Sequence, residues 1–531
     1  MKRKFVFTII LIFALCHTSN GQTDRSKTEL KFNKALQTIA SNYVDTVNQP
    51  QLVEHAIKAM IKELDPHSVY LTKKELDKAN ESLIGNFDGI GVTYQIIDDT
   101  IYIISTVRGG PSEKSGVLAG DRFIKIDGEE AIGSKIDNNY VQKKLRGKKG
   151  SEVIVNIYRK STKENLEITI KRDKIPIYSV DAYFMLTTEI GYIKINRFAK
   201  NTMKEYQMGL IQLQFSGMKH LVLDLRGNSG GYLNTATNLA DEFLEKDKLI
   251  VYTEGINNPK HTYNATVKGS FEKGKLVVLI NEGSASASEI VAGAIQDWDR
   301  GLILGRMSFG KGLVQRPFYL PDGSAIRLTT ARYYTPTGRC IQKPYSDGVD
   351  KYRKELSERY KHAEHINADS IDFPDSLKYY TPNKRIVYGG GGIMPDIFIP
   401  LDTTRDSKYY ISLRDKGLLN LFILKYIDNN RENLKKEYPT YEVFAKDFNL
   451  NNGFFDSFLK FSIEKGVQKD DDGLEKSRKY IQYQLKALMA RTMFENSNYY
   501  NVNVDIDDDI QKAIEIINKK RMFKKMDISY K

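Results

Sequence analysis

The segment with the most potential for chemistry is NEGSASASEIVAGAIQDW, which runs from Asn281 to Trp298. Its three serines, Ser284, Ser286 and Ser288, alternate with alanines just before an apolar, helix-like run. A serine where a strand meets a helix lies at the carboxyl end of the sheet, where α/β folds place their ligands. The start of the helix also offers free backbone N–H groups and a positive dipole end, which stabilise a developing oxyanion. The segment therefore predicts either a nucleophilic serine or a helix cap.

The helix-cap alternative applies to Ser286, because Glu289 follows it by three residues as in the capping-box pattern Ser-x-x-Glu. As a nucleophile, Ser286 needs a base, and none of the seven histidines lies within this segment. Lys311, in SFGKGLVQ, has a glycine on each side and apolar residues after it, which suits a side chain directed into a dry pocket. An ordinary lysine has a pKa of about 10.4 and acts as a base only where burial favours its neutral form. The alternative for Lys311 is an exposed turn.

The N-terminus has the pattern of an export signal. MKRK is positively charged, FVFTIILIFALC is an apolar run too short to span a bilayer comfortably, and small residues precede an expected cut before Gln22. A buried N-terminal helix and a lipid-modified Cys16 are the alternatives, so membrane association stays open. We expect the mature protein to work outside the cytoplasm, in the periplasm of a Gram-negative-type cell.

Composition excludes several other classes of function. The formal charge of +13 is spread as mixed lysine and acidic residues without an Arg-rich tract, which favours a solvated surface over nucleic-acid binding. Cys16 and Cys340 are the only cysteines, so a mature chain without its signal has no internal disulfide. We expect Cys340 to be buried. The histidines form no HExxH pattern, and no metal site or cofactor is expected.

Several kinds of element must position the serine and the lysine. Residues near the N-terminus show helical periodicity, short β-rich runs begin near Gly85, and apolar strands alternate with helical segments after Gly191. The polar stretch 343–388 is typical of an insertion or long loop. The expected segments are a signal at 1–21, helices at 22–83, strands with two helices at 84–173, an α/β layer at 174–403 and a helical extension at 404–531.

Several motifs in order resemble a known family. GIGV at Gly89–Val92 and GGPSEKSGVLAGDRFIKIDGE at Gly109–Glu129 are similar to a PDZ domain of the bacterial permuted type. LVLDLRGNSGG, NEGSASASEIVAG, SFGKGLVQ and GGIMPDI follow, as in the C-terminal processing peptidases, or tail-specific proteases, which use a Ser/Lys pair. The resemblance extends from about Thr28 to Asp402. It implies a multidomain α/β protein with a helical N-terminal region, a PDZ domain, a crotonase-like α/β serine peptidase core and a helical C-terminal extension.

The resemblance also implies roles for individual residues. Ser286 becomes the nucleophile and Lys311 its base, and Gln315 orients the lysine amine, since positions 311, 313 and 315 share one face if a strand begins there. The oxyanion donors are the N–H of Ala287 and one from the glycine pair Gly230 and Gly231. The expected nest for a tail carboxylate is Gly89, Ile90, Gly91 and Val92, and Arg146 is the candidate for sensing the bound tail.

Two functions of different classes follow. One is an exported serine endopeptidase that recognises protein tails through its PDZ domain and cleaves by an acyl-enzyme mechanism. The other is a non-catalytic PDZ scaffold, which the presence of Ser286, Lys311 and Gln315 disfavours. A Ser-His-Asp hydrolase is disfavoured because GxSxG does not occur. The expected partners are proteins or peptides with apolar C-termini and no nucleic acid, while self-association through the terminal helices and an adaptor protein are left open.

Overall fold

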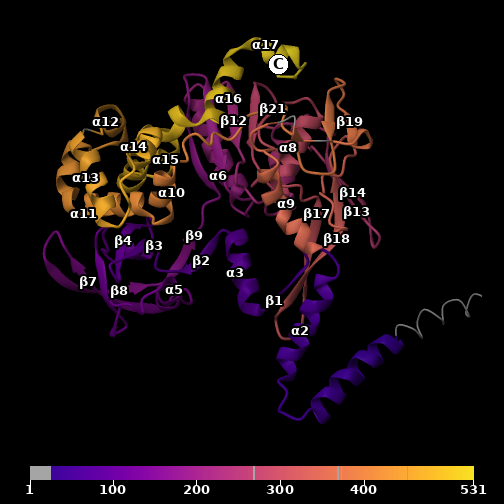
Figure 1. The fold of residues 1–531 in the computed structure, drawn as a ribbon, viewed down its shortest axis with the longest axis horizontal. Coiled ribbons are helices and arrows are strands. Elements are labelled where there is room, and N and C mark those ends of the chain that lie inside the picture. The colour runs from indigo at the N-terminus through magenta and orange to yellow at the C-terminus, as the bar shows by residue number, and fades with distance from the viewer. Residues whose placement is uncertain (1–25, 267–268, 368–369, 372, 451, 531) are drawn as a thin grey trace, which may run out of the picture. The chain divides into compact units, whose positions relative to one another are not determined.

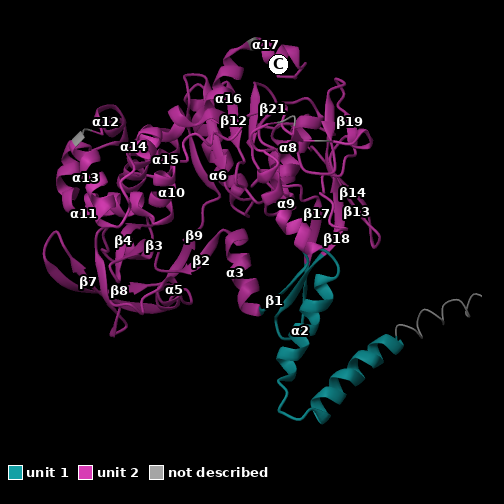
Figure 2. Ribbon diagram, in the orientation of Figure 1, with its two compact units in different colours: residues 1–72, 317–328 teal, residues 73–316, 329–531 magenta. Residues whose placement is uncertain are grey.

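The computed structural model describes residues 26–530 except 267–268, 368–369, 372 and 451. The expected export signal and Cys16 lie outside the described residues. The chain forms two compact units, one of residues 1–72 with 317–328 and the other of residues 73–316 with 329–531 (Figure 2). Among the described residues, no helix has the length and the apolar composition needed to cross a membrane.

The smaller unit contains the helical N-terminal region. Residues 26–42 are helical, and α2 (Gln49–Lys62) and β1 (Val69–Leu71) follow. The carboxylate of Asp65 accepts the backbone N–H of His67 at 2.8 Å, which forms the turn between α2 and β1. Strand β1 pairs antiparallel with the first residues of β18 (Ala325–Tyr334).

The predicted PDZ domain is a twisted antiparallel sheet with short helices. Helix α3 (Lys73–Ile84) precedes it. The elements of the domain are β2 (Asn86–Gly89), β3 (Val92–Ile97), β4 (Thr100–Thr106), α4 (Pro111–Lys114), β5 (Arg122–Ile126), β6 (Glu129–Glu130), α5 (Asn138–Leu145), β7 (Glu152–Arg159), β8 (Glu164–Lys171) and β9 (Asp173–Pro176). The main sheet has the order β3-β4-β5-β7-β8, and β2 pairs with β9 where the chain enters and leaves the domain. Its core contains Ile101, Phe123 and Val141, all fully buried. Helix α5 begins where the carboxylate of Asp137 accepts the N–H of Tyr140 at 2.7 Å.

A mostly parallel six-stranded sheet forms the centre of the larger unit (Figure 1). Its order is β10-β11-β12-β15-β16-β21, with only the β10–β11 pair antiparallel. The strands are β10 (Val180–Met185), β11 (Ile190–Ile195), β12 (His220–Asp224), β15 (Leu276–Ile280), β16 (Leu302–Gly305) and β21 (Ile397–Phe398). Runs such as LVVLI are apolar throughout because both faces of a parallel sheet are covered.

Different parts of the chain cover the two faces of this sheet. Helices α6 (Thr202–Phe215), α7 (Leu233–Asp241) and α8 (Ala287–Asp297) lie on the first face and share a core with Leu221 and Leu223. The side chain of Val222 points the opposite way and packs on the second face against α16 (Asp508–Asn518), with α17 (Lys520–Lys525) following. The helices α16 and α17 therefore complete the layer structure of the larger unit.

The remaining elements flank the first face. They are β13 (Leu249–Gly255), β14 (Asn258–Asn264), β17 (Leu313–Tyr319), α9 (Val349–Lys361), η2 (Asp375–Leu377), β19 (Lys378–Tyr380) and β20 (Ile386–Tyr388). The polar stretch 343–388 thus holds a helix, and Arg359 on it donates to the carbonyl of Ser308 at 2.9 Å. Cys340 is only half-buried, contrary to our expectation, and this partial burial raises the pKa of its thiol.

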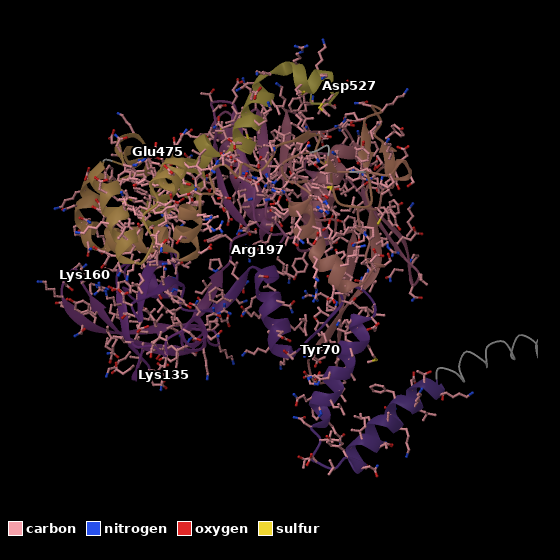
Figure 3. All side chains as sticks on the ribbon, viewed as in Figure 1. Tyr70, Lys135, Lys160, Arg197, Glu475 and Asp527 are labelled. Atoms are coloured by element: carbon pink, nitrogen blue, oxygen red, sulfur yellow. The ribbon has the colours of Figure 1, made fainter. Side chains whose placement is uncertain are left out.

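The first part of the C-terminal extension has its own core. It comprises α10 (Lys408–Asp415), α11 (Leu418–Glu437), α12 (Tyr441–Asp447), α13 (Asn452–Glu464), α14 (Asp471–Met493), α15 (Asn496–Asn503) and η3 (Val504–Ile506). Aromatic side chains such as Phe422, Phe444 and Phe458 fill this core. Lys160, labelled in Figure 3, lies between β7 and β8 of the PDZ domain. Its Nζ donates to the carboxylate of Asp428 at 3.1 Å. The predicted fold class is confirmed in its four parts, and the extension contacts both the PDZ domain and the central sheet.

Candidate active site

The three serines of the central segment have different environments. The Ser284 hydroxyl is fully buried and donates to the carbonyl of Leu225 at 2.9 Å. The Ser288 hydroxyl is also fully buried and donates to the carbonyl of Asn228 at 2.7 Å. Ser286, between them, is partly exposed. The structure thus assigns two of the three serines to packing and leaves Ser286 accessible to a substrate.

The backbone at Ser286 adopts a conformation that is rare for a residue other than glycine. Its φ is 55° and its ψ is −110°, outside the favoured regions, and such strain gathers at functional sites. Ala287 is the first residue of α8, so its N–H has no acceptor within the helix. A Cβ on Gly230 would lie 2.9 Å from the Cβ of Ser286, so only glycine allows that loop to approach the serine so closely.

A single buried carboxylate fixes the backbone on both sides of the site. Glu289 is fully buried, and its Oε2 accepts the N–H of Ser286 at 2.7 Å and the N–H of Lys311 at 3.0 Å. Its Oε1 accepts the hydroxyl of Ser308 at 2.6 Å and the N–H of Gly310 at 2.7 Å. Burial raises the pKa of Glu289, while these four donors act in the opposite direction. Glu289 therefore does more than complete a capping box, because it joins the loop of Ser286 to the loop of Lys311.

Tyr333 joins the same two loops a second time. Its hydroxyl lies 2.7 Å from the carbonyl oxygen of Lys311 and 3.2 Å from that of Ser286. Burial raises the pKa of Tyr333 well above its usual value, so the phenol keeps the proton that it donates. Two buried side chains, Glu289 and Tyr333, thus hold the residues expected to act as nucleophile and base in one fixed geometry.

Lys311 and Gln315 are brought together as the sequence predicts. The Nζ of Lys311 donates to Oε1 of Gln315 at 2.8 Å. Lys311 precedes β17 by two residues, so it does not begin the strand, and Gln315 lies within it. Lys311 is half-buried, and the glycine at 312 after it is buried.

The glycine pair near Ser286 differs in the engagement of its N–H groups. The N–H of Gly230 donates to Oδ1 of Asn228 at 2.9 Å. A backbone bridge pairs Gly231 with Phe198, but its two hydrogen bonds use the carbonyl of Gly230 and the N–H of Tyr232. This pairing therefore does not consume the N–H of Gly231, which makes Gly231 the better candidate of the pair for an oxyanion donor.

The residues expected to bind a protein tail lie around the edge of the PDZ sheet. Gly89 ends β2, Ile90 is buried, Gly91 has φ +74°, and Val92 begins β3. Strand β3 stands at one end of the sheet order. The side chains of β3 that face the core pack near α5, among them Tyr94.

Arg146 follows the last residue of α5 and reaches out of the domain. Its Nη1 donates to the carboxylate of Glu81 on α3 at 2.6 Å, and its guanidinium lies 4.5 Å from the ring centre of Phe87. Helix α3 in turn contacts the catalytic core, because the carbonyl of Leu83 accepts the N–H of Lys200 at 3.0 Å. Arg146 thus lies at a point where the PDZ domain and the helix leading to the core meet.

Sequence reasoning missed Tyr333 and Asn228, and it treated Glu289 only as a helix cap. Asn228 is fully buried, and besides accepting from Gly230 it donates from Nδ2 to the carbonyl of Ile195 at 3.0 Å. Its position within LVLDLRGNSGG could have marked it, since an amide can fix a glycine turn. Tyr333 lies in a β-rich run and carries no local signal.

Comparison with family models identifies the parts of the chain. The model for peptidase family S41 matches residues 189–351, and a PDZ domain model matches residues 89–170. The N-terminal domain of the activating protease CtpB matches residues 14–75. A family of unknown function matches residues 409–495, within the C-terminal extension.

The chain matches named relatives over most of their length. The carboxy-terminal processing protease CtpB of Bacillus subtilis is 37% identical over 330 residues, which is 61% of this chain and 68% of that protein. The carboxy-terminal-processing protease of Bartonella bacilliformis is 34% identical over 342 residues, 64% of this chain and 78% of that protein. Among solved structures, the photosystem II D1 C-terminal processing protease is 28% identical with a TM-score of 0.33, covering 59% of this chain and 89% of that one. The chain therefore belongs to the carboxy-terminal processing proteases, serine-type peptidases of family S41 that carry a PDZ domain.

Proposed function

We propose that this protein is an exported endopeptidase in which Ser286 is the nucleophile and Lys311 the base, and in which the PDZ domain selects substrates by their C-terminal tails. The observation that carries the catalytic part is the double connection between the two loops. Glu289 binds the N–H groups of Ser286 and Lys311, and Tyr333 binds both of their carbonyls. A constellation held from two sides in a buried setting is preorganised for one geometry.

The reaction would follow from the chemistry of these groups. Neutral Lys311 takes the proton of the Ser286 hydroxyl, whose oxygen attacks the peptide carbonyl carbon. The N–H groups of Ala287 and Gly231 stabilise the oxyanion of the tetrahedral intermediate. When the C–N bond breaks, the Lys311 ammonium returns its proton to the departing amine. A water, activated by Lys311, then attacks the ester and releases the new carboxyl group.

Gln315 has a definite part in this scheme. A neutral lysine amine has two N–H donors and one lone pair, and only the lone pair can accept the serine proton. The bond to Oε1 of Gln315 uses one of the two donors and so restricts the direction of the lone pair. We propose that Gln315 orients the base and does not react itself.

The catalytic assignment is tested by removing each group in turn. Ser286→Ala and Lys311→Ala should lower cleavage of a peptide substrate by about a thousandfold or more, as for other nucleophile–base pairs. Ser346→Ala and Lys351→Ala are matched controls, because they remove the same groups from exposed positions. A fluorophosphonate probe should label the wild type and not the Ser286→Ala variant. Full activity of purified Lys311→Ala would contradict the proposal, and a wild type that binds peptides without cleaving them would favour a scaffold.

Tail recognition is supported by the position of β3. A strand at the end of a sheet has backbone groups available to pair with an extended peptide, and a glycine turn beside it can gather N–H groups around a carboxylate. The turn at Gly91 lies directly before β3. The side chains of Val92, Tyr94 and Ile96 on β3 are apolar or aromatic and only partly buried against the core of the domain, and on this basis we propose a preference for apolar, uncharged tails.

The tail proposal is tested with one substrate in three forms: a free apolar C-terminus, the same terminus amidated, and a terminus of charged residues. The free apolar form should be cleaved fastest. Equal rates for all three would show that the PDZ domain does not select tails. Arg146→Ala, compared with the exposed Lys148→Ala, should weaken the discrimination if Arg146 signals tail binding.

Export is supported only by the N-terminal sequence pattern. Fractionation of cells that express the full chain should place it outside the cytoplasm, with an N-terminus that begins near Gln22. A full-length protein in the cytoplasmic fraction would contradict this part of the proposal and leave the catalytic part intact.

A further inference from the structure

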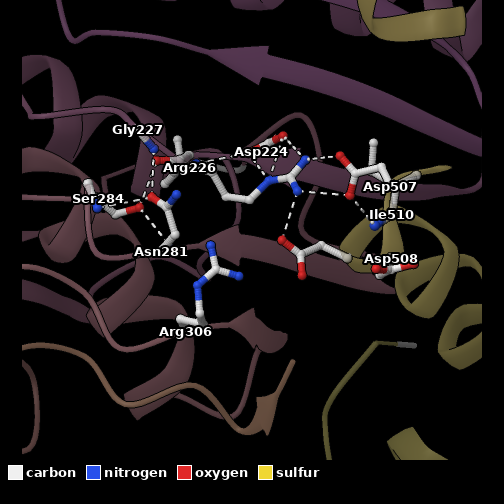
Figure 4. A network of polar contacts seen from close by, with 12 residues as sticks. Asp224, Arg226, Gly227, Asn281, Ser284, Arg306, Asp507, Asp508 and Ile510 are labelled. Atoms are coloured by element: carbon white, nitrogen blue, oxygen red, sulfur yellow. Dashed lines mark hydrogen bonds and ion pairs between the residues drawn. The ribbon is translucent and has the colours of Figure 1, made fainter. Parts of the chain in front are cut away.

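Arg226 connects the active-site loop to the end of the chain. It follows β12 in the segment that leads to Gly230 and Gly231, and it is largely buried. Its guanidinium is held from both sides: by Asp224, the last residue of its own strand, and by residues of the C-terminal extension nearly 300 positions later (Figure 4).

The C-terminal contacts satisfy one whole side of the guanidinium. Its Nη1 donates to Oδ1 of Asp507 at 2.9 Å and to Oδ2 of Asp509 at 2.8 Å, and its Nη2 donates to Oδ2 of Asp507 at 2.9 Å. The opposite side, Nε and Nη2, donates to Asp224 at 2.6–3.1 Å. Planar paired contacts of this kind fix the orientation of an arginine as well as its position.

The surrounding charges show why both sides are needed. The Nζ of Lys194 donates to Oδ1 of Asp224 at 3.0 Å and also to the carbonyl of Arg226. Asp224 therefore faces two buried cations, which hold the pKa of its carboxyl well below the usual range against the effect of burial. One carboxylate cannot neutralise both Lys194 and Arg226. Asp507 and Asp509 add two further carboxylates, and Arg306 is a third cation near Asp509.

The loop fixed in this way is bonded to the loop that carries the nucleophile. The N–H of Gly227, next to Arg226, donates to Oδ1 of Asn281 at 2.8 Å. The Asn281 N–H in turn donates to the hydroxyl of Ser284, which donates to the carbonyl of Leu225. Figure 4 shows this path from Asp507 through Arg226 to Ser284, two residues before Ser286.

We infer that Asp507 and Asp509 are positioning residues for catalysis, and that the C-terminal extension completes the active site by holding Arg226 and with it the oxyanion loop. This inference rests on the proposed function of Ser286. Without the two carboxylates, Nη1 of Arg226 loses both of its charged acceptors, and the guanidinium is held only by Asp224. A donor displaced by a fraction of an ångström stabilises the oxyanion less, while the substrate in its ground state is bound almost as before.

The test uses the full-length protein with Asp507→Asn, Asp509→Asn and the double variant. These substitutions keep the shape of the side chain and remove its charge. We expect kcat of the double variant to fall by roughly 10- to 100-fold, less than the 10²–10³-fold loss of a whole oxyanion donor, with KM changed less than about twofold. Labelling by a fluorophosphonate, which also forms an oxyanion, should slow in parallel.

Asp508→Asn is the matched control, because it removes an exposed carboxylate from the same turn, where it pairs with Arg405. It should keep kcat within about twofold of the wild type. If the double variant also stays within twofold, or if KM rises while kcat is unchanged, the inference is wrong. If the wild type shows no cleavage that Ser286→Ala abolishes, the proposed function itself fails, and this result is distinct from the others.

The single variants keep the test decisive if the double variant does not fold. Each leaves one carboxylate on Nη1, so each should unfold within a few degrees of the wild type and still lose several-fold in kcat. A second measurement compares Asp507→Glu with Asp507→Asn. The glutamate variant should have the higher kcat, since its carboxylate can reach Arg226 again. Equal kcat values for these two variants would overturn the inference.

Discussion

The two faces of the central sheet are covered in different ways. Helices α6, α7 and α8 follow the strands that they cover, so the first face is built from neighbouring parts of the chain. The second face is covered by α16 and α17, which lie more than 200 residues after most of the strands. Long-range closure of this kind is slow to form and depends on the whole chain being present.

The difference also separates chemistry from support. The first face carries the start of α8, with Ser286 at its edge and Glu289 in its first turn. The described part of the second face carries neither Ser286 nor Lys311, but Asp507 caps its helix α16 and Asp509 lies in the first turn, and both hold Arg226. An extension that could be taken for an appendage is therefore a structural layer of the catalytic unit.

The strongest test of this comparison places a buried charge on each face of the central sheet. If one face accepted the charge and the other did not, the two faces would not be equally needed for folding. Ala292 on α8 and Ala513 on α16 are both fully buried against the sheet. An unpaired buried carboxylate costs several kcal/mol, which is comparable with the roughly 5–15 kcal/mol of total stability. We expect Ala292→Asp and Ala513→Asp to be equally unable to fold, as measured by near-UV circular dichroism and soluble yield.

Asn518→Asp is the control for this pair, because Asn518 is exposed near the end of α16. It should fold as the wild type does. A folded, active Ala513→Asp would show that the second face is dispensable and that α16 is only attached to the core.

The next effect concerns the carboxylate on the first face. Each oxygen of the Glu289 carboxylate accepts two hydrogen bonds. In Glu289→Gln, an NH₂ group replaces one of these oxygens, so two donors lose their acceptor. Each unsatisfied donor costs about 1–3 kcal/mol, so we expect a loss of about 4 kcal/mol in unfolding free energy together with a large loss of kcat. Urea denaturation and peptide cleavage measure the two effects. Unchanged stability would mean that the four bonds do not hold the loops together.

A third prediction compares packing on the two faces directly. Ile295 on α8 and Ile516 on α16 are both buried, one on each face. Truncation of a buried isoleucine to alanine costs about 2–5 kcal/mol, so Ile295→Ala and Ile516→Ala should each lose about 3 kcal/mol. Ile463→Ala, at an exposed position on α13, should change stability by less than about 0.5 kcal/mol. A small loss for Ile516→Ala alone would show that the second face is loosely packed.

The sequence could predict most of the first face and little of the second. Ser286 and Lys311 lie in short segments with recognisable chemistry. The extension at 404–531 was expected to be helical, and its α14 has apolar residues at helical spacing, such as Ile481 and Leu485, which are buried. For α16, the apolar positions Ile510, Ala513 and Ile517 also follow a helical period, so a helix with one apolar face could have been expected.

What that face packs against could not be expected, because no local pattern connects α16 to strands so far away in the sequence. The same holds for Arg226, whose partners Asp507 and Asp509 lie 281 and 283 residues later. Tyr333 was missed for a similar reason: its hydroxyl acts through contacts that exist only once β18 is beside the two loops. Short sequence segments identify the residues proposed to react, whereas the residues that position them come together only in the folded protein.

The smallest predicted effect separates positioning from stability at Asp509. Burial raises the pKa of this carboxyl and nearby Asp507 adds to the rise, while Arg226 and Arg306 oppose it. A carboxyl whose pKa is higher in the folded protein than the unfolded value of about 3.9 contributes stability that is fully present below that value and is lost as the pH rises through the folded pKa.

An asparagine at position 509 has no proton to lose in this pH range. The wild type's advantage in unfolding free energy over Asp509→Asn should therefore shrink as the pH is raised from 4 towards 7, as measured by urea denaturation with Asp508→Asn as the control. An advantage that grows over this interval would mean that Arg226 outweighs burial and that Asp509 acts mainly on stability. If it shrinks while kcat at pH 7 is still reduced, the ionised carboxylate is retained for its hold on Arg226, at some expense in stability.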